Sequence, residues 1–436
     1  MPFLFTAEKK VQLLWCTITI SMSLDTSAIR RQFPALQQQI NGHPLVYLDS
    51  AATAQVPMAV LEAMSECERH DRGNPHRGMH VLAERATEKF ESARKTVAEF
   101  IGAATHEIIF TRNATESLNI VAKSWGKQNV KKGDVVALTL LEHHSAIVPW
   151  LQHKEDIGIE IAWVGIDETG MPRMEELEEL LKAGKTKMVC ITGQSNVLGV
   201  RPPLKDIIKT AHASGALVTV DATQLIAHHP VDVADLDCDF LVFSGHKLYG
   251  PTGIGVLYGK RKLLEAMPPF LGGGGMIGNV TKTGFTAADI PQKFEAGTPP
   301  LAQAVGLAAT IDWISQYPWK DIEAHETKLI RAAVTALADI PDLKFLPNFA
   351  RDKVPQAGAL LSGCISFIIR GSHPHDLTDV LGNRGICLRA GHHCCQPLHD
   401  HLNIPASTRV SVGIYNTEDE VTLLVRAIDE ALKTLA

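Results

Sequence analysis

The sequence predicts an α/β protein: a large domain with a mostly parallel sheet flanked by helices, then a smaller α+β domain at the C-terminus. Three observations predict this fold class. Apolar runs of strand length alternate with helical patterns between residues 107 and 258, which is typical of parallel sheets with helices on both faces. Small and polar residues stand at the carboxyl ends of these runs, where open α/β sheets bind ligands. From about residue 302 the pattern changes to a long helix followed by mixed strands and helices.

The composition is that of a globular enzyme. The chain has 436 residues, enough for two packed domains, with 45% hydrophobic and 21% charged residues. The net charge of -6 has no basic run behind it, so nucleic acid is not an expected partner. The eight cysteines form no CxxC pair, which favours a reducing compartment over a disulfide framework or a zinc module.

Residues 1–22 are predicted to be a disordered extension, or to result from a start codon assigned too far upstream. The apolar run between Val11 and Ile20 is interrupted by polar residues and has no small-x-small cleavage site. It is also too short to span a bilayer. We therefore expect a cytoplasmic protein without a membrane partner. The first helix is expected to begin at Asp25 or Thr26, whose side chains suit an N-cap.

The later elements are predicted from periodicity and turn residues. A short amphipathic helix is expected over 26–39, and an apolar run then ends at Asp49. The small residues after Asp49 let the backbone approach a ligand closely. Helices are predicted at 57–72, 80–101, 173–183, 203–213, 319–338, 375–383 and 417–434, and strands at 107–111, 135–140, 159–164, 187–192, 216–221, 240–243, 255–258, 364–370, 386–389 and 408–412.

Lys247 and Asp221 are the first candidate site residues. Lys247 lies in a polar turn between two apolar strands, and Asp221 ends the apolar run before them. Pyridoxal 5'-phosphate (PLP) requires such a pair: an amine for the Schiff base and a carboxylate that keeps the pyridine nitrogen protonated. A surface lysine after a strand is the alternative. The neighbouring Ser244 and His246, together with the upstream acid, favour the cofactor site.

Other polar positions fall on the same predicted edge of the sheet. Thr115 follows a strand and begins a helix, where free N–H groups and the helix dipole favour a phosphate; an ordinary N-cap is the alternative. His143 also follows a strand, where an imidazole can stack on a planar cofactor or lie at the surface. Asn196 follows a third strand, and its amide suits a cofactor hydroxyl or a substrate carboxylate. Arg77 is left open as an anion contact or a surface charge.

Two further stretches stand out. The irregular segment 271–300 is longer than a compact enzyme normally tolerates outside a binding site or a subunit contact. In the predicted small domain, Cys394 and Cys395 lie in a loop with glycine, histidine and Arg389, a setting that suits a nucleophilic thiol. Other cysteines lie within or at the ends of apolar strand-like runs, which indicates buried structural thiols instead. These are Cys190, Cys238, Cys364 and Cys387.

Together these motifs resemble the group II cysteine desulfurases, the SufS/CsdA type of the class V aminotransferase superfamily. The matching motifs are Glu-His-His, Ser-Asn-Val-Leu-Gly, Ser-Gly-His-Lys-Leu-Tyr-Gly-Pro-Thr-Gly, Phe-Glu-Ala-Gly-Thr-Pro and Arg-x-Gly-His-His-Cys, and the likeness covers about residues 27–434. It implies PLP-dependent fold type I, with a seven-stranded sheet in the large domain. It also implies a homodimer that takes sulfur from L-cysteine, leaves alanine, and passes a persulfide to a SufE-like or SufU-like acceptor for Fe–S cluster assembly. The expected domains are an N-terminal segment at 23–44 packing on the small domain, a large domain at 45–301 and a small domain at 302–436.

The resemblance also implies a role for each site residue. Lys247 forms the Schiff base and moves protons, Asp221 pairs with the pyridine nitrogen, and His143 stacks on the ring. Cys394 attacks the substrate sulfur. The residues that bind the cofactor phosphate and phenolate are Thr115, Gln224, Ser244 and His246. Thr298 binds the phosphate of the neighbouring subunit's cofactor. Asn196 and Arg409 bind the substrate carboxylate, and Arg389 lies close by.

One departure from the family pattern bears on the chemistry. The residue after the nucleophile is usually small or hydroxylated, whereas here it is Cys395. Cys395 is an inert thiol, a partner in an oxidation-sensitive vicinal disulfide, or a substitute nucleophile. Competing functions are a selenocysteine lyase or cysteine sulfinate desulfinase, another class V enzyme, and a non-catalytic binding protein. A non-catalytic binding protein would be expected to lack the lysine, the acid or the phosphate-binding helix start, and this sequence has all three.

Overall fold

A seven-stranded sheet forms the centre of the larger unit in the computed structural model, which describes residues 24–347 and 361–435. The strand order is β4-β10-β9-β8-β7-β5-β6. The pairs β4–β10 and β10–β9 are antiparallel and the others are parallel, so the predicted mostly parallel α/β sheet is confirmed. The strands are β4 (Ile108–Thr111), β5 (Val135–Thr139), β6 (Glu160–Val164), β7 (Thr186–Thr192), β8 (Leu217–Asp221), β9 (Phe240–Ser244) and β10 (Gly255–Gly259).

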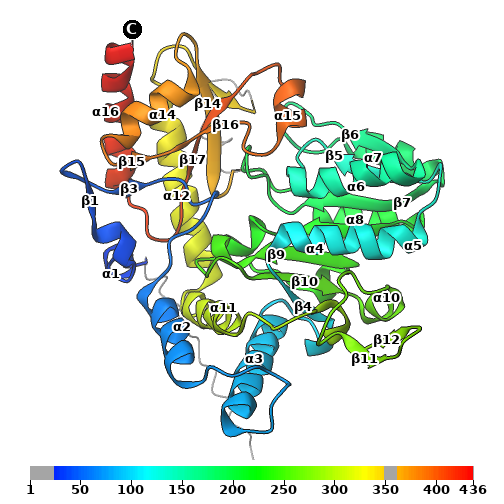
Figure 1. Ribbon diagram of the computed structural model, residues 1–436. Coiled ribbons are helices and arrows are strands. Elements are labelled where there is room, and N and C mark those ends of the chain that lie inside the picture. The colour runs from blue at the N-terminus through cyan, green and yellow to red at the C-terminus, as the bar shows by residue number, and fades with distance from the viewer. Residues whose placement is uncertain (1–23, 348–360, 436) are drawn as a thin grey trace, which may run out of the picture.

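Helices cover both faces of this sheet (Figure 1). The strands are apolar on both sides because each face is buried: along β9, Leu241 and Phe243 face one layer while Phe240 and Val242 face the other. The first layer holds α3 (Val81–Phe100), α7 (Met174–Lys182), α8 (Leu204–Ala213) and α11 (Leu301–Ile314). The second holds α4 (Ala114–Ile120), a π-helical turn (Val121–Gly126), α6 (His144–Ile157) and α10 (Arg261–Ala266).

The C-terminal unit has its own antiparallel sheet, and its core also includes residues of the larger unit such as Leu141 and Val197. Its strand order is β13-β14-β17-β16, and Figure 1 shows it above and to the left of the larger sheet. The strands are β13 (Leu343–Leu346), β14 (Cys364–Ile369), β16 (Arg389–Gly391) and β17 (Ser407–Ser411). The helices are α12 (Trp319–Leu337), α14 (Pro374–Gly382), α15 (Gln396–His401) and α16 (Glu418–Leu435).

The N-terminal segment joins the two units. The helix expected over 26–39 is wrong in length: α1 (Thr26–Arg31) ends before Pro34, because a residue before proline is kept out of the helical region. A single turn and the pair β1 (Gln39–Ile40) and β2 (His43–Pro44) follow. Then β3 (Val46–Tyr47) pairs in parallel with β15 (Ile386–Cys387) of the C-terminal unit. The extension predicted at residues 1–22 lies outside the described residues.

Several elements were not predicted from the sequence. Besides the helix α6, they include a hairpin formed by β11 (Ile277–Val280) and β12 (Phe285–Ala287), which lies inside the segment predicted to be irregular. The helix α2 (Met58–His70) agrees with its prediction, while the short helices α5 (Lys127–Asn129) and α9 (Val233–Leu236) were not predicted. Among the described residues no helix is long and apolar enough to cross a membrane.

Candidate active site

A cavity of about 210 Å³ lies at the carboxyl ends of β7, β8 and β9, where the C-terminal unit meets the larger sheet. Segments distant in the sequence line it. They include the turn after β3, the start of α4, the turns after the three strands, and the loop after β16. Ten of the twelve predicted site residues line this cavity: Thr115, His143, Asn196, Asp221, Ser244, His246, Lys247, Arg389, Cys394 and Arg409.

Lys247 lies in the one-turn helix after β9 and lines the cavity. Burial lowers the pKa of Lys247 from 10.5 to about 8, although the nearby Asp221 carboxylate opposes this effect. Arg409 adds to the lowering because two cations repel. A neutral, nucleophilic amine is therefore much more accessible at neutral pH than for an ordinary lysine.

Asp221 ends β8 beside Lys247, and its carboxylate is only partly used by the protein. Oδ1 accepts a hydrogen bond from the Thr223 backbone N–H at 3.0 Å, and burial raises the pKa of Asp221. Thr223 also lines the cavity, and its side chain opposes the effect of burial on the pKa of Asp221. The Asp221 carboxylate and the Thr223 hydroxyl make this wall of the cavity polar, which suits a polar ligand.

His143 and His246 contribute neutral rings. His143 caps α6: its Nδ1 accepts from the Ser145 N–H at 3.2 Å and lies 2.6 Å from the Ser145 hydroxyl. Burial and the nearby Lys247 lower the pKa of His143 to about 3. The same two causes lower the pKa of His246 to about 4, and its Nδ1 lies 3.1 Å from the Thr53 hydroxyl. Both rings stay uncharged at neutral pH and add no cation next to the amine.

The end of the cavity formed by α4 has the features of an anion site. Thr115 lies in the first turn of α4, after the cap Asn113, whose side chain accepts from the Glu116 N–H at 3.0 Å. Ser244 holds the start of this helix, because its hydroxyl accepts from the Ala114 N–H at 2.9 Å. Free N–H groups at a helix start favour a phosphate.

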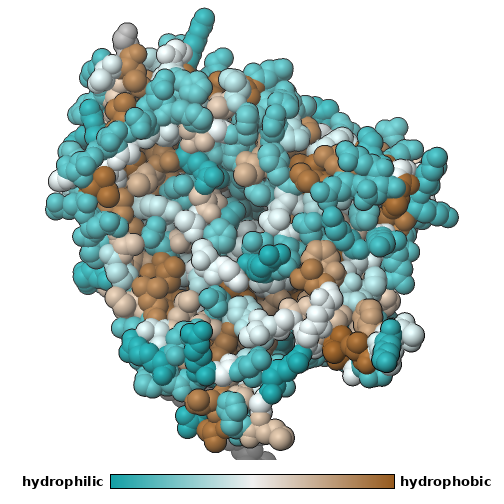
Figure 2. All heavy atoms as spheres, in the orientation of Figure 1, coloured by the Kyte–Doolittle hydropathy of each residue, from teal (hydrophilic) through white to brown (hydrophobic). Residues whose placement is uncertain are grey.

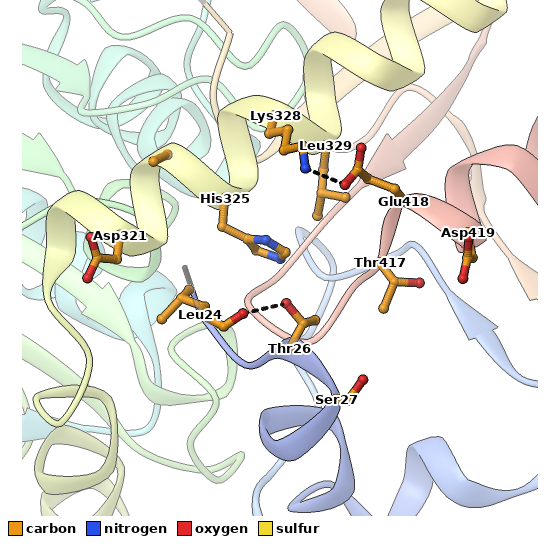
Figure 3. Close-up of a pocket in the computed structure, with 11 residues that line it drawn as sticks. Leu24, Thr26, Ser27, Asp321, His325, Lys328, Leu329, Thr417, Glu418 and Asp419 are labelled. Carbon is orange, nitrogen blue, oxygen red and sulfur yellow. Dashed lines mark hydrogen bonds and ion pairs between the residues drawn. The ribbon is translucent and has the colours of Figure 1, made fainter. Parts of the chain in front are cut away.

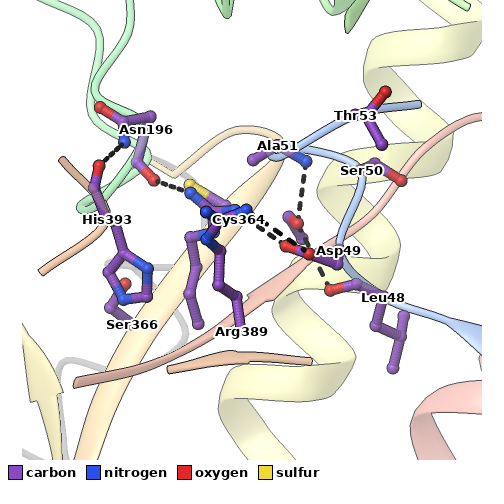
Figure 4. A network of polar contacts seen from close by, with 12 residues as sticks. Leu48, Asp49, Ser50, Ala51, Thr53, Asn196, Cys364, Ser366, Arg389 and His393 are labelled. Carbon is purple, nitrogen blue, oxygen red and sulfur yellow. Dashed lines mark hydrogen bonds and ion pairs between the residues drawn. The ribbon is translucent and has the colours of Figure 1, made fainter. Parts of the chain in front are cut away.

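The opposite end of the cavity is cationic. Arg409 on β17 is almost fully buried; its Nη1 donates to the Asn196 carbonyl at 2.9 Å and its Nη2 donates to Asp49 Oδ1 at 2.9 Å. Arg389 on β16 lies farther out, with its Nη1 4.0 Å from Asp49 Oδ2. Figure 4 shows Asp49, Arg389 and Asn196 converging on this point from three different elements. The sequence reading did not assign Asp49, although an acid at the end of an apolar run was the same signal that identified Asp221.

Cys394 lies on a loop with an unusual backbone. Cys394 and His393 have φ values of 58° and 50°, a left-handed conformation that is uncommon for residues other than glycine. The His144 N–H donates to the Cys394 carbonyl at 2.8 Å, and the Gln396 N–H donates to His144 Nε2 at 3.0 Å. The Asn196 amide donates to the His393 carbonyl at 2.8 Å. These contacts hold the loop against the larger unit and leave the Cys394 thiol exposed.

Cys395, the next residue, is in the opposite environment. Its side chain is fully buried, and its thiol donates to Asn196 Oδ1 at 3.2 Å. Burial, with Glu142 nearby, raises the pKa of Cys395 far above its ordinary value. A thiol that is buried and neutral is a poor nucleophile.

Two predicted site residues do not line this cavity. The Gln224 side chain is buried and donates to the Ala51 carbonyl at 2.8 Å, which holds the turn after Asp49 in place. Thr298 lines a separate cavity of about 460 Å³, together with Arg77 and Gly275. Another cavity, of about 550 Å³, lies between α1, α12 and the start of α16 (Figure 3). None of the predicted site residues lines it.

Comparisons with known proteins agree with this geometry. The family model described as Aminotransferase class-V matches residues 46–424. A protein of Vibrio cholerae named "Probable cysteine desulfurase" is 44% identical over 415 residues, covering 95% of this chain and all of that protein. A "Cysteine desulfurase" of Haloferax volcanii is 42% identical, over 95% of this chain and 99% of that one.

Solved structures show the same likeness. The crystal structure of the cysteine desulfurase CsdA from Escherichia coli superposes with a TM-score of 0.86 at 39% identity, covering 95% of this chain and 100% of that one. The apo structure of a cysteine desulfurase from Thermococcus onnurineus NA1 gives a TM-score of 0.84 at 36% identity, covering 92% and 98%.

Proposed function

The chain belongs to the class-V aminotransferase family, and on that premise we propose that it is a PLP-dependent cysteine desulfurase whose sulfur-accepting residue is Cys394. The observation that carries the proposal is the position of two reactive groups from different units. The Cys394 thiol, exposed on the loop after β16, lines the same cavity as the half-buried Lys247. A family member that did not abstract sulfur would need the amine but not the thiol.

The residues of the cavity suit PLP. The helix start at Thr115, with Ser244 and His246, offers donors for the phosphate, Asp221 offers a carboxylate for the ring nitrogen, and Lys247 offers the amine. The polar Thr223 side chain in the same wall supports a polar occupant. When bound, PLP supplies an electron sink that lets the substrate lose its α-proton and weakens its carbon–sulfur bond.

The protein residues supply binding and proton movement. Arg409, helped by Asn196 and Arg389, binds the substrate carboxylate, and its unpartnered Nε donor is available for that carboxylate. Lys247 Nζ removes the proton from the substrate α-carbon, a role for which its lowered pKa suits it. Burial lowers the pKa of His143 to about 3, so its ring stays uncharged and adds no cation to the site where the substrate ammonium group binds.

Cys394 then takes the sulfur. Its thiolate attacks the substrate sulfur, an S–S bond forms, and the substrate's Cβ–S bond breaks. The electron pair of that bond stays on Cβ, which takes up a proton and so becomes the methyl group of alanine. The persulfide remains on Cys394, and its exposure suits transfer to the thiol of a SufE-like or SufU-like acceptor protein.

We further propose that the functional unit is a homodimer of this chain. Thr298 lies outside the cavity of its own chain, which supports a role toward the phosphate bound by a partner. Apolar side chains are exposed where a partner would cover them: Met58 and Leu61 on α2, and Met79, Val81 and Leu82 at the start of α3. Figure 2 shows apolar side chains at the lower end of the molecule, where α3 begins in Figure 1. We place this homodimer in the cytoplasm, as the cysteine pattern suggests.

The test is alanine release from L-cysteine by the PLP-loaded protein under reducing conditions. Cys394→Ala should abolish it, whereas Cys395→Ala, the matched control next to it in the chain, should retain it. L-selenocysteine should still react with the Cys394→Ala variant, because selenium can leave without a thiol to abstract it. Alanine release from L-cysteine at the parental rate by Cys394→Ala would refute the assignment.

A further inference from the structure

The two residues that flank Cys394 are linked to each other by buried hydrogen bonds. The His393 Nε2 atom lies 3.0 Å from the Ser407 hydroxyl on β17, and the His399 Nε2 atom on α15 lies 3.0 Å from the same hydroxyl. The His399 Nδ1 atom lies 3.0 Å from the Cys395 carbonyl. These contacts run from the residue before Cys394 to the residue after it, and we call His393, Ser407, His399 and Cys395 the loop network.

The chemistry of these groups gives each hydrogen bond a direction. A carbonyl oxygen only accepts, so His399 Nδ1 carries the proton that is donated to Cys395. Burial lowers the pKa of His399, so its ring is neutral and its Nε2 accepts from the Ser407 hydroxyl. That hydroxyl has a single proton, so its oxygen accepts from the N–H group at His393 Nε2. Ser407 therefore holds both rings in one tautomer each.

Burial makes the loop network sensitive to the loss of any one member. His399 and Ser407 are fully buried, and His393 is only 5% exposed. Burial lowers the pKa of His393 to about 2, and Arg409 and His399 act in the same direction, so this ring is also neutral. A buried donor or acceptor is costly to leave unpaired. Without the Ser407 hydroxyl, neither Nε2 atom would keep this partner.

The loop network surrounds a strained piece of backbone. His393 and Cys394 both have left-handed φ values, and residues other than glycine keep such a conformation only where the surrounding contacts enforce it. The Asn196 amide holds the His393 carbonyl (Figure 4). The His144 N–H holds the Cys394 carbonyl. The loop network adds the ring of His393 and the carbonyl of Cys395, so the backbone is held on both sides of the thiol.

From these contacts we propose that Ser407 and His399 are positioning residues for sulfur abstraction, because they hold the Cys394 thiol where the substrate sulfur arrives. Neither residue lines the cavity, so both act through Cys394. Cofactor binding and removal of the α-proton do not depend on the loop network, because Asp221 and Lys247 are positioned by β8 and by the turn after β9. The inference rests on the proposed function in requiring that Cys394 abstract the sulfur.

Turnover of two substrates by the PLP-loaded protein separates the position of the thiol from a general loss of structure. Ser407→Ala should lower kcat for L-cysteine by roughly ten- to a hundredfold, as expected when a reacting group is misplaced by about 1 Å. KM should change much less, because Asn196 and Arg409 remain to bind the carboxylate. The kcat for L-selenocysteine should be unchanged, because selenium can leave without a thiol. Ser407→Thr keeps the hydroxyl and should restore most of the activity toward L-cysteine.

A double-variant cycle tests whether Ser407 and His399 act together. His399→Leu should lower kcat for L-cysteine as Ser407→Ala does, and the double variant should lose no more than the larger single loss, whereas independent effects would multiply. The control is His401→Ala, at an exposed position of the same helix α15, which should leave both substrates unaffected. Equal losses for both substrates, an unchanged L-cysteine rate in Ser407→Ala, or multiplied losses in the double variant would overturn the proposal.

Hydrogen exchange separates this inference from the proposed function. The N–H groups of Cys395 and Gln396 donate to the His392 carbonyl at 2.9 Å and to His144 Nε2 at 3.0 Å. In PLP-loaded Ser407→Ala both should exchange faster than in the parental protein, as measured by mass spectrometry of the peptide that contains them. If the parental protein releases no alanine from L-cysteine, the desulfurase assignment fails, while the exchange still decides whether Ser407 holds the loop. Unchanged exchange in this peptide would show that it does not.

Discussion

Adjacent residues in this chain can have opposite chemistry because of their surroundings. Cys394 and Cys395 share a loop, but one thiol is exposed beside Lys247 and the other is buried against Asn196. The sequence left three roles open for Cys395. Its burial and its raised pKa favour the inert thiol over a substitute nucleophile, and its hydrogen bond to Asn196 gives it a part in holding the loop.

The first prediction concerns Lys247 in the cofactor-free protein. Its pKa is lowered to about 8, so the amine is charged below that pH and neutral above it. The rate of PLP capture should therefore rise with pH and level off above about pH 8, instead of rising further toward the ordinary lysine value of 10.5. Cofactor absorbance followed over time at a series of pH values measures this rate.

Lys247→Ala is the control and should capture no PLP covalently at any pH. A capture rate that kept rising well past pH 8, as for a solvated lysine, would show that burial does not set the reactivity of this amine.

At the scale of elements, one buried ion pair fixes the loop that carries Thr298. Arg94 of α3 is fully buried, and its Nη1 lies 2.6 Å from Glu295 Oε1 in the segment before α11. The same Arg94 group donates to the Ile108 carbonyl and stacks 4.9 Å from the centre of the Phe110 ring. Glu295 also accepts from the Phe110 N–H at 2.7 Å. This network joins α3, β4 and the Thr298 loop.

Arg94→Met should therefore destabilise the protein strongly. The substitution leaves the Glu295 carboxylate buried without its cation, which typically costs about 3–5 kcal/mol of unfolding free energy. Denaturant unfolding measured against the parental protein checks the value. Arg261→Met, which breaks an exposed pair with Glu265 on α10, should have little effect. An unchanged unfolding midpoint for Arg94→Met would contradict the account.

Elements were predictable where one local signal dominated. The strands of the larger sheet are uninterrupted apolar runs because both faces are buried, so their ranges agree within a residue or two. The helix α6 was missed because Pro149 lies inside it and interrupts its pattern. The hairpin β11–β12 was missed because its apolar residues Val280 and Phe285 are exposed and form no buried face.

At the scale of the whole molecule, the site depends on contacts between distant segments. The carboxyl edge of the sheet was predictable, because it follows from topology, and it placed Lys247, Asp221, His143 and Asn196 together. The pairing of Asp49 with Arg409 was not, because it joins the N-terminal segment to β17 through tertiary packing alone. Nor does a single chain bring Thr298 to the cavity that contains Lys247.

This separation predicts complementation between subunits. If Thr298 serves the partner's cofactor, mixing Lys247→Ala and Thr298→Ala chains produces a mixed dimer with one fully parental site and one doubly altered site. Activity should then exceed that of either variant alone. Refolding the two together and measuring alanine release and PLP retention tests this. If Thr298 serves its own chain, the mixture contains no parental site and its activity stays at the average of the two variants.

The central claim is that sulfur from L-cysteine first becomes bound to Cys394. The most direct measurement is mass spectrometry of the PLP-loaded protein after brief reaction with L-cysteine in the absence of any acceptor. Fragmentation of the peptide that spans the two cysteines should place one added sulfur atom on Cys394 and none on Cys395. An added sulfur on Cys395, or alanine formed with no sulfur on either residue, would contradict the account.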